Sequence, residues 1–148
     1  MKVQEQASTK NRLFPNQKYP IDGQVFKSLI IAGLTWLRTN QETVNILNVY
    51  PIPDGDTGTN MVLTMQAACE QIVDSDESNI GKLTHQIASG ALNGARGNSG
   101  VILSQLWRGF ARELDNIEEL DGQLLAKAFR TGSNTANLGV MKPVEARY

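Results

Sequence analysis

The chain has 148 residues, of which 41% are hydrophobic, and this length and composition suit one folded domain with a core. The formal net charge is -1, so charge gives no reason to expect a nucleic acid or an anionic membrane surface as a partner. Cys69 and His85 are the only cysteine and histidine. These counts exclude an internal disulfide and a zinc site built from His and Cys, and they disfavour a Ser-His-Asp hydrolase.

No segment has the apolar character of a membrane span or of a secretory signal. The apolar runs are far shorter than the ~20 residues that a membrane-spanning helix needs. The N-terminal residues MKVQEQASTKNRLFPNQKYP contain no apolar core of a signal peptide. We therefore expect no transmembrane segment and a location in the reducing cytoplasm, which a lone cysteine also fits. The sequence leaves the oligomeric state open, including a homo-oligomer.

Residues 1–22 are polar and contain Pro15 and Pro20, so we expect them to form a loosely ordered lead-in to a domain over residues 23–148. A helix should follow, because apolar residues recur at the spacing of one helical face. That face consists of Phe26, Leu29, Ile30, Gly33, Leu34 and Leu37. A short helical piece through Val44 and Leu47 should then lead into a loop that ends at Gly58.

Three more helices are predicted after this loop. Thr57 or Thr59 should cap the first of them, and Asn98 or Ser99 should cap the third, because Ser, Thr and Asn side chains accept hydrogen bonds from helix N-termini. The second should run from about Ile80 to Leu92. The inward stripes of the three helices are Met61, Met65, Ala68 and Ile72; Ile80, Leu83, Ile87 and Ala91; and Leu103, Leu106, Phe110 and Leu114.

A fifth helix should begin near Gln123 with Leu124, Leu125 and Ala128. Its continuation TGSNTANLG, residues 131–139, is poor in helix formers, so helix there requires support from tertiary packing. No strand pattern or internal repeat is visible. The predicted fold class is therefore all-α, with short connections that favour antiparallel neighbouring helices.

The segment NVYPIPDGDTGTN, residues 48–60, carries two carboxylates, Asp54 and Asp56, in a loop where two prolines resist helix. Carboxylates this close repel each other unless a cation lies between them, and hard oxygen ligands suit Mg²⁺ or Ca²⁺. An EF-hand does not fit, because Gly58, Thr59 and Met65 occupy positions that need an acidic or amide residue, Gly and Glu. A glycosidase pair and an ordinary Asp-Gly turn are the other interpretations.

A second segment, GARGNSG, places Gly94, Gly97 and Gly100 before a predicted helix N-terminus. It is neither a Walker A motif nor a dinucleotide fingerprint. Its backbone N–H groups and the helix dipole favour an anion, and Asn98 and Ser99 add side-chain donors. The competing interpretation is a tight turn between helices with Ser99 as its cap. Together the two loops predict Mg²⁺ bridging nucleotide phosphates.

The segments NVYPIPDGDTGTNM and GALNGARGNSGVILSQ resemble the DhaL (Dak2) family, and within it the N-terminal kinase domain of the bacterial fatty acid kinase A branch. The resemblance covers about residues 23–145 and includes VMKPVE, residues 140–145. It implies an antiparallel helical barrel or bundle that binds ATP at one end. The sequence ends soon after VMKPVE, where the family continues, so we expect the bundle to be incomplete at the C-terminus and its activity alone to be doubtful.

The resemblance also assigns residues to roles. It implies that Asp54 and Asp56 are the catalytic carboxylates that hold two Mg²⁺ ions on the phosphates, with Asn48 as a neutral third ligand. It places six further residues at the nucleotide phosphates: Thr59, Asn60, Gly97, Asn98, Ser99 and Gly100. The implied reaction is ATP-dependent phosphorylation of the carboxylate of a fatty acid, presented by a separate fatty-acid-binding protein of the DegV type. The alternatives are the nucleotide-binding part of a dihydroxyacetone (glycerone) kinase and a truncated, non-catalytic helical domain.

Overall fold

The computed structural model describes residues 20–50 and 52–145, with the backbone alone for residues 141–145. Most of the predicted polar lead-in, residues 1–19, lies outside this range, as do Pro51 and residues 146–148. Within the described residues the chain forms six helices and no β-strand, so the predicted all-α class is confirmed. The helices are α2 (Gly23–Thr39), α3 (Gln41–Leu47), α4 (Thr57–Glu70), α5 (Ile80–Asn93), α6 (Gly97–Glu113) and α7 (Gly122–Glu145).

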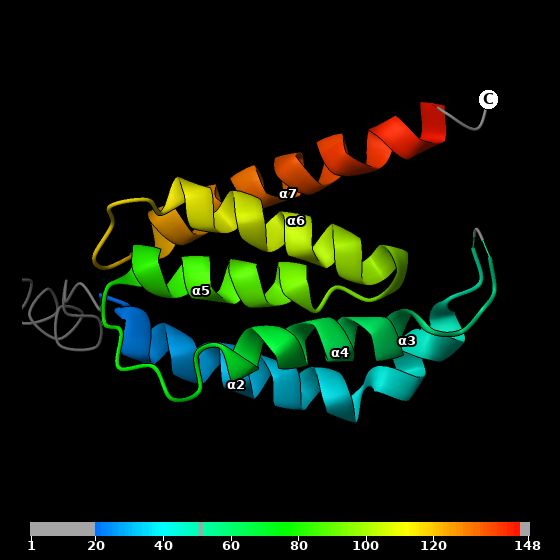
Figure 1. The fold of residues 1–148 in the computed structure, drawn as a ribbon, viewed down its shortest axis with the longest axis horizontal. Helices are drawn as coiled ribbons and strands as arrows, with labels where there is room; N and C mark the ends of the chain where they lie inside the picture. The colour runs from blue at the N-terminus through cyan, green and yellow to red at the C-terminus, as the bar shows by residue number, and fades with distance from the viewer. Residues whose placement is uncertain (1–19, 51, 146–148) are drawn as a thin grey trace, which may run out of the picture.

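The long helices form an antiparallel bundle in which the chain runs up and down between two ends (Figure 1). One end carries α3, the loop that leads into α4, and the connection between α5 and α6. The opposite end carries the connection from α4 to α5 and the connection from α6 to α7. Helix α6 packs against α4, α5 and α7, whereas the described parts of α2 and α7 do not contact each other. The described helices therefore form an open array, and one end of it gathers both motifs that the sequence singles out.

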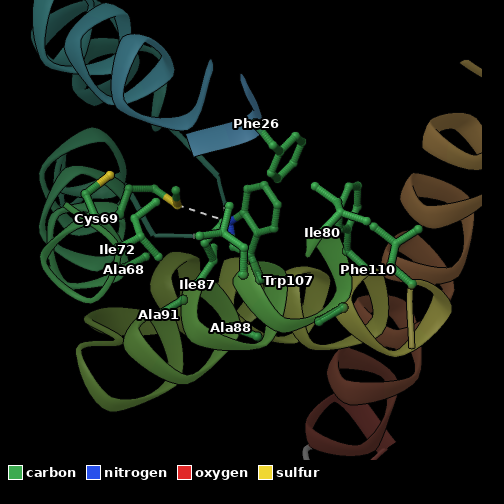
Figure 2. Close-up of a cluster of buried hydrophobic side chains, with 14 of the residues drawn as sticks. Phe26, Ala68, Cys69, Ile72, Ile80, Ile87, Ala88, Ala91, Trp107 and Phe110 are labelled. Atoms are coloured by element: carbon green, nitrogen blue, oxygen red, sulfur yellow. Dashed lines mark hydrogen bonds between the residues drawn. The ribbon is translucent and has the colours of Figure 1, made fainter. Parts of the chain in front are cut away.

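The core forms where α2, α4, α5 and α6 meet (Figure 2). Phe110 is fully buried and its ring packs within 5.7 Å of Phe26 and 5.2 Å of Trp107, measured between ring centroids. The indole N–H of Trp107 points to the sulfur of Met65 at 3.1 Å. Cys69 is buried, and burial raises the pKa of its thiol. These contacts give α4 and α6 a shared apolar interface that sets their relative position.

Two predictions about packing need correction. A tryptophan is ordinarily expected to pack in a core, yet 67% of Trp36 is exposed, and it is not among the buried residues of α2. The predicted inward face of α2 is only partly covered: Phe26 and Leu34 are buried, while Leu29 is exposed. An apolar cavity of about 210 Å³ remains beside this face. It is lined by Leu29, Ile30, Gly33, Leu34, Leu37, Met61, Met65, Leu103 and Trp107.

Helix α7 continues through residues 131–139 despite their poor helix propensity. Two glycines let it approach α6 closely: a Cβ at Gly109 would lie 2.3 Å from Thr135 Oγ1, and a Cβ at Gly132 would lie 2.7 Å from the Leu106 carbonyl. Thr131 also donates to Glu113 of α6 at 2.8 Å. Tertiary packing thus supports the helix where its own sequence does not.

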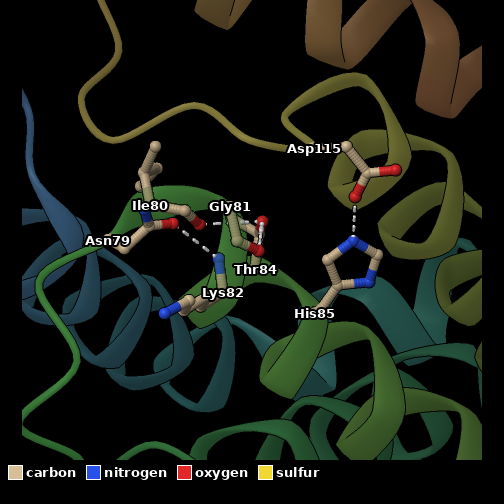
Figure 3. A network of polar contacts seen from close by, with 7 residues as sticks. All are labelled: Asn79, Ile80, Gly81, Lys82, Thr84, His85 and Asp115. Atoms are coloured by element: carbon tan, nitrogen blue, oxygen red, sulfur yellow. Dashed lines mark hydrogen bonds and ion pairs between the residues drawn. The ribbon is translucent and has the colours of Figure 1, made fainter.

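The end of the bundle opposite the two motifs is held by polar contacts (Figure 3). Asn79 caps α5 by accepting from the Lys82 N–H at 3.0 Å. The His85 side chain is exposed and pairs with Asp115 in the connection to α7. No helix within residues 20–50 and 52–145 has both the length and the apolar character that crossing a membrane would require.

Candidate functional site

The first loop presents both predicted carboxylates to solvent. Asp54 and Asp56 are exposed on either side of Gly55, whose φ of 64° allows a turn that other residues rarely adopt. Asn48 donates from its amide nitrogen to Asp54 Oδ1 at 2.6 Å. The three residues predicted to ligate metal therefore lie in one loop, with Asn48 and Asp54 in direct contact.

Asp56 stands at the N-cap of α4, so the prediction that Thr57 or Thr59 caps this helix is wrong. The Asp56 carbonyl already accepts from the Asn60 N–H at 2.9 Å, which places Thr57 and Thr59 inside the first turn. The Asp56 carboxylate itself makes no capping hydrogen bond. An Asp at the N-cap ordinarily accepts hydrogen bonds from N–H groups of the first turn. Because Asp56 forms no such bond, its carboxylate is available for another partner.

Helix α3 contributes two residues that the sequence did not suggest as part of the site. Gln41 Nε2 and Asn45 Nδ2 both donate to Thr59 Oγ1, each at 3.0 Å. Asn45 Oδ1 also accepts from the Thr59 N–H at 3.1 Å. The one signal that could have revealed them is weak: two amide side chains four residues apart share a face of a short helix.

The second loop turns at Gly97, whose φ is 60°. Helix α6 begins at this residue with Arg96 at the N-cap and no side-chain capping bond, so the prediction that Asn98 or Ser99 caps it is wrong. The Arg96 carbonyl already accepts from the Gly100 N–H at 3.0 Å, which draws both residues into the first turn. Their side chains are consequently not occupied in capping the helix.

The two loops meet at three places. Ser99 Oγ lies 3.4 Å from Thr57 Oγ1, a long hydrogen bond across the two first turns. A Cβ at Gly97 would lie 2.4 Å from Asn60 Nδ2, so only glycine allows this approach. Deeper in the interface, Thr64 Oγ1 accepts from the Arg96 N–H at 3.1 Å and would lie 2.4 Å from a Cβ at Gly100. The start of α4, which directly follows Asp56, and the turn from Gly97 to Gly100 are therefore in contact, and we refer to this region as the surface shared by the two loops.

The donor set of this surface suits a hard divalent cation. Neither Asp54 nor Asp56 forms an ion pair with any residue in the described ranges. The same ranges contain no group of three or more His, Cys, Asp or Glu residues placed so that together they could hold a metal ion. Two carboxylates and one amide side chain leave several coordination positions open, and Mg²⁺ commonly fills such positions with water and phosphate oxygens. The residues present therefore fit Mg²⁺ bound together with a phosphate ligand.

The N-termini of α4 and α6 lie next to each other at this surface, as the contact between Thr57 and Ser99 requires. The first N–H groups of a helix lack partners within the helix, and the helix dipole adds partial positive charge there. Neither helix has an acidic residue in its first turn. Two adjacent helix N-termini favour an anion, and the carboxylate of Asp56 lies at the N-cap of one of them.

The fold defines an all-helical domain, in which the first turns of α4 and α6 bring the two loops together at one end. The chain matches the DAK2 domain family over residues 51–146 and belongs to that family, which is associated with kinase activity. The match includes the second loop and the first loop from residue 51 onward, so Asn48 lies just before it.

Similar proteins occur in Staphylococcus aureus. Uncharacterized proteins of strains USA300, COL and Mu50 are each 50% identical to this chain over 125 residues. The aligned part is 84% of this chain and 23% of each relative, so the chain spans about a quarter of the length of the curated relatives that it matches.

Proposed function

We propose that this chain is the nucleotide-binding part of an ATP- and Mg²⁺-dependent phosphotransferase that phosphorylates the carboxylate of a protein-bound fatty acid. The observation that carries the proposal is the meeting of the two loops, with Ser99 Oγ 3.4 Å from Thr57 Oγ1. This contact supports the proposal because it brings the turn at Gly97 to the start of α4, next to Asp56, so that both loops would reach the same triphosphate. Membership of the DAK2 family supports the choice of ATP as the ligand.

Each group in the site has a task in this proposal. Asp54 and Asp56, with Asn48 as a neutral third ligand, would hold two Mg²⁺ ions, which supply positive charge against the phosphates. The N–H group of Gly97 and the side chains of Asn98 and Ser99 would bind phosphate oxygens. Gly100, whose N–H already donates to the Arg96 carbonyl, would keep this turn close to α4. Thr59 and Asn60 would line the opposite side of the phosphates. These residues fix the nucleotide, and positioning of this kind accounts for most of the catalysis in phosphoryl transfer.

The proposed reaction joins a carboxylate oxygen of the fatty acid to the γ-phosphorus. The bond from the γ-phosphorus to the bridging oxygen breaks, so the products are an acyl phosphate and ADP, in which the bridging oxygen remains. The acceptor would be delivered by a separate fatty-acid-binding protein of the DegV type. The proposed location is the cytoplasm, with which the lone buried Cys69 agrees.

Thermal unfolding with and without Mg·ATP tests nucleotide binding. A ligand that binds only the folded chain raises its stability by about 2.7 kcal/mol at a hundredfold excess over Kd, so the melting temperature should rise. Asp54→Ala and Asp56→Ala should abolish the rise, whereas Asp76→Ala should retain it, because Asp76 is exposed in the connection between α4 and α5. An unchanged melting temperature of the parent chain at millimolar Mg·ATP would refute nucleotide binding.

The acceptor is tested separately, by trapping acyl phosphate with hydroxylamine in mixtures of the chain, a DegV-type protein loaded with fatty acid, and Mg·ATP. Formation of the hydroxamate supports the fatty acid as acceptor. Nucleotide binding without hydroxamate, together with phosphorylation of dihydroxyacetone in a parallel assay, would replace the proposed acceptor and leave the nucleotide site standing.

A further inference from the structure

Two side chains, those of Asp56 and Asn45, could cap the first turn of α4. The capping hydrogen bond comes from Asn45, which is the more distant in the sequence. Asp56 occupies the N-cap position but makes no capping bond. Asn45, eleven positions earlier and on another helix, accepts from the Thr59 N–H at 3.1 Å and donates to Thr59 Oγ1 at 3.0 Å. An N-cap side chain normally accepts from this same N–H, the third of the helix. Asn45 has thus taken the capping role of Asp56.

Close packing of α3 on α4 makes this exchange possible. A Cβ at Gly58 would lie 2.3 Å from the Gln41 carbonyl oxygen and 3.0 Å from Asn45 Oδ1. Only a glycine at this position lets α3 come near enough for the Asn45 amide to reach the backbone of α4. Gln41 supports the arrangement with its own bond to Thr59 Oγ1 at 3.0 Å.

We propose that Asn45 is a positioning residue, which caps α4 from α3 and thereby leaves the Asp56 carboxylate free to hold a divalent cation. A carboxylate that caps its own helix directs its oxygens at backbone N–H groups and shares its charge with the helix N-terminus. Such a carboxylate is a poorer ligand than one that faces solvent. The inference rests on the proposed function, since it names the residue that prepares Asp56 for the cation in that site.

A cycle of variants tests the exchange of caps without any nucleotide. In the parent chain Asp56→Ala should change the melting temperature little, because Asp56 does not cap. In an Asn45→Ala background Asp56 can turn inward to cap α4, so Asp56→Ala should now lower the melting temperature by several degrees. Asn79→Ala is the matched control: it removes an Asn cap from α5, at the other end of the bundle, and should leave the effect of Asp56→Ala as in the parent. An equal effect of Asp56→Ala in all three backgrounds would overturn the proposal.

A conservative variant separates capping from general packing. Asn45→Asp keeps an oxygen for the Thr59 N–H, so Asp56→Ala should again cost little in that background. If Asn45→Ala does not fold, Asn45→Leu, which has a similar shape and no polar atoms, takes its place in the cycle. A large effect of Asp56→Ala in the Asn45→Asp background would refute the role of the Asn45 oxygen.

The dependence of nucleotide binding on Mg²⁺ gives the functional measurement. Asn45→Ala should raise the Mg²⁺ concentration for half-maximal ATP binding severalfold, whereas Asn79→Ala should leave it unchanged even where both variants melt at the same temperature. Equal Mg²⁺ dependence in both would show that Asn45 acts only on stability and would overturn the proposal. Absence of ATP binding by the parent chain refutes the proposed function, while the cycle with Asp56 still decides whether Asn45 replaces Asp56 as the cap.

Discussion

Gly97 lies so close to Asn60 that a Cβ at residue 97 would come within 2.4 Å of Asn60 Nδ2. The two residues belong to the first turns of α6 and α4 and are thirty-seven positions apart in the sequence. Gly97 also has a φ of 60°, which an L side chain rarely adopts. Backbone conformation and lack of space therefore both require glycine at the point where the two loops meet.

Replacement of this glycine should damage the site. In Gly97→Ala the left-handed conformation costs roughly 1–2 kcal/mol, and the new methyl group must displace the Asn60 amide. We expect a lower melting temperature and loss of the stabilisation by Mg·ATP. Gly122→Ala is the control, because a Cβ there meets nothing within 4 Å. A Gly97→Ala chain that still gained full stabilisation from Mg·ATP would show that the turn does not contact the nucleotide.

Ser99→Ala should weaken nucleotide binding more than it weakens the fold. The hydroxyl makes only a long bond of 3.4 Å to Thr57, so its loss should change the free energy of unfolding by less than about 1 kcal/mol. A lost hydrogen bond to a charged phosphate is worth about 1.5–3 kcal/mol, which would raise the Kd for Mg·ATP more than tenfold. Isothermal titration calorimetry measures the Kd, and Ser133→Ala, on the exposed side of α7, provides the comparison. An unchanged Kd would remove Ser99 from the site.

The aromatic cluster around Phe110 should dominate the stability of the bundle. Phe110 is 0% exposed and packs against the rings of Phe26, Trp107 and Phe129. Phe110→Ala should lower the free energy of unfolding by about 3–5 kcal/mol, the range for truncation of a buried Phe. Trp36→Ala should change it far less, because Trp36 is 67% exposed. Urea titration followed by circular dichroism compares the two, and equal losses would contradict this packing.

Acidification should loosen the contact between α6 and α7 through Glu113. Hydrogen bonds from Lys127 and Thr131 lower the pKa of this carboxyl below its ordinary value of 4.5. Because the folded chain holds the charged form more strongly than the unfolded chain does, the resulting stability is present above about pH 4.5 and is lost as the pH falls through the lowered pKa. Glu113→Gln should therefore reduce the pH dependence of the melting temperature below pH 5. The contribution is modest, since water screens the exposed Lys127, and identical pH profiles for both chains would contradict it.

Local pattern predicted most of the helices. The spacing of apolar residues located α2, α5 and α6 within a few residues, because periodicity depends only on which face of a helix is apolar. The same reasoning found the two loops, since prolines, glycines and paired carboxylates mark such segments without reference to the rest of the fold. It failed at the helix starts: Thr57 and Ser99 were expected to cap helices and instead lie inside their first turns.

The arrangement of the site depends on packing between segments that are distant in the sequence. Ser99 meets Thr57 because the apolar faces of α4 and α6 share a core around Met65 and Trp107, and no local pattern encodes that distance. Asn45 takes over the cap of α4 only because Gly58 admits α3. The sequence by itself therefore determined which residues could hold a metal–phosphate ligand. Tertiary structure decided that the first turns of α4 and α6 meet. The packing of side chains between helices sets how the helices lie against each other, and the periodicity within one helix does not.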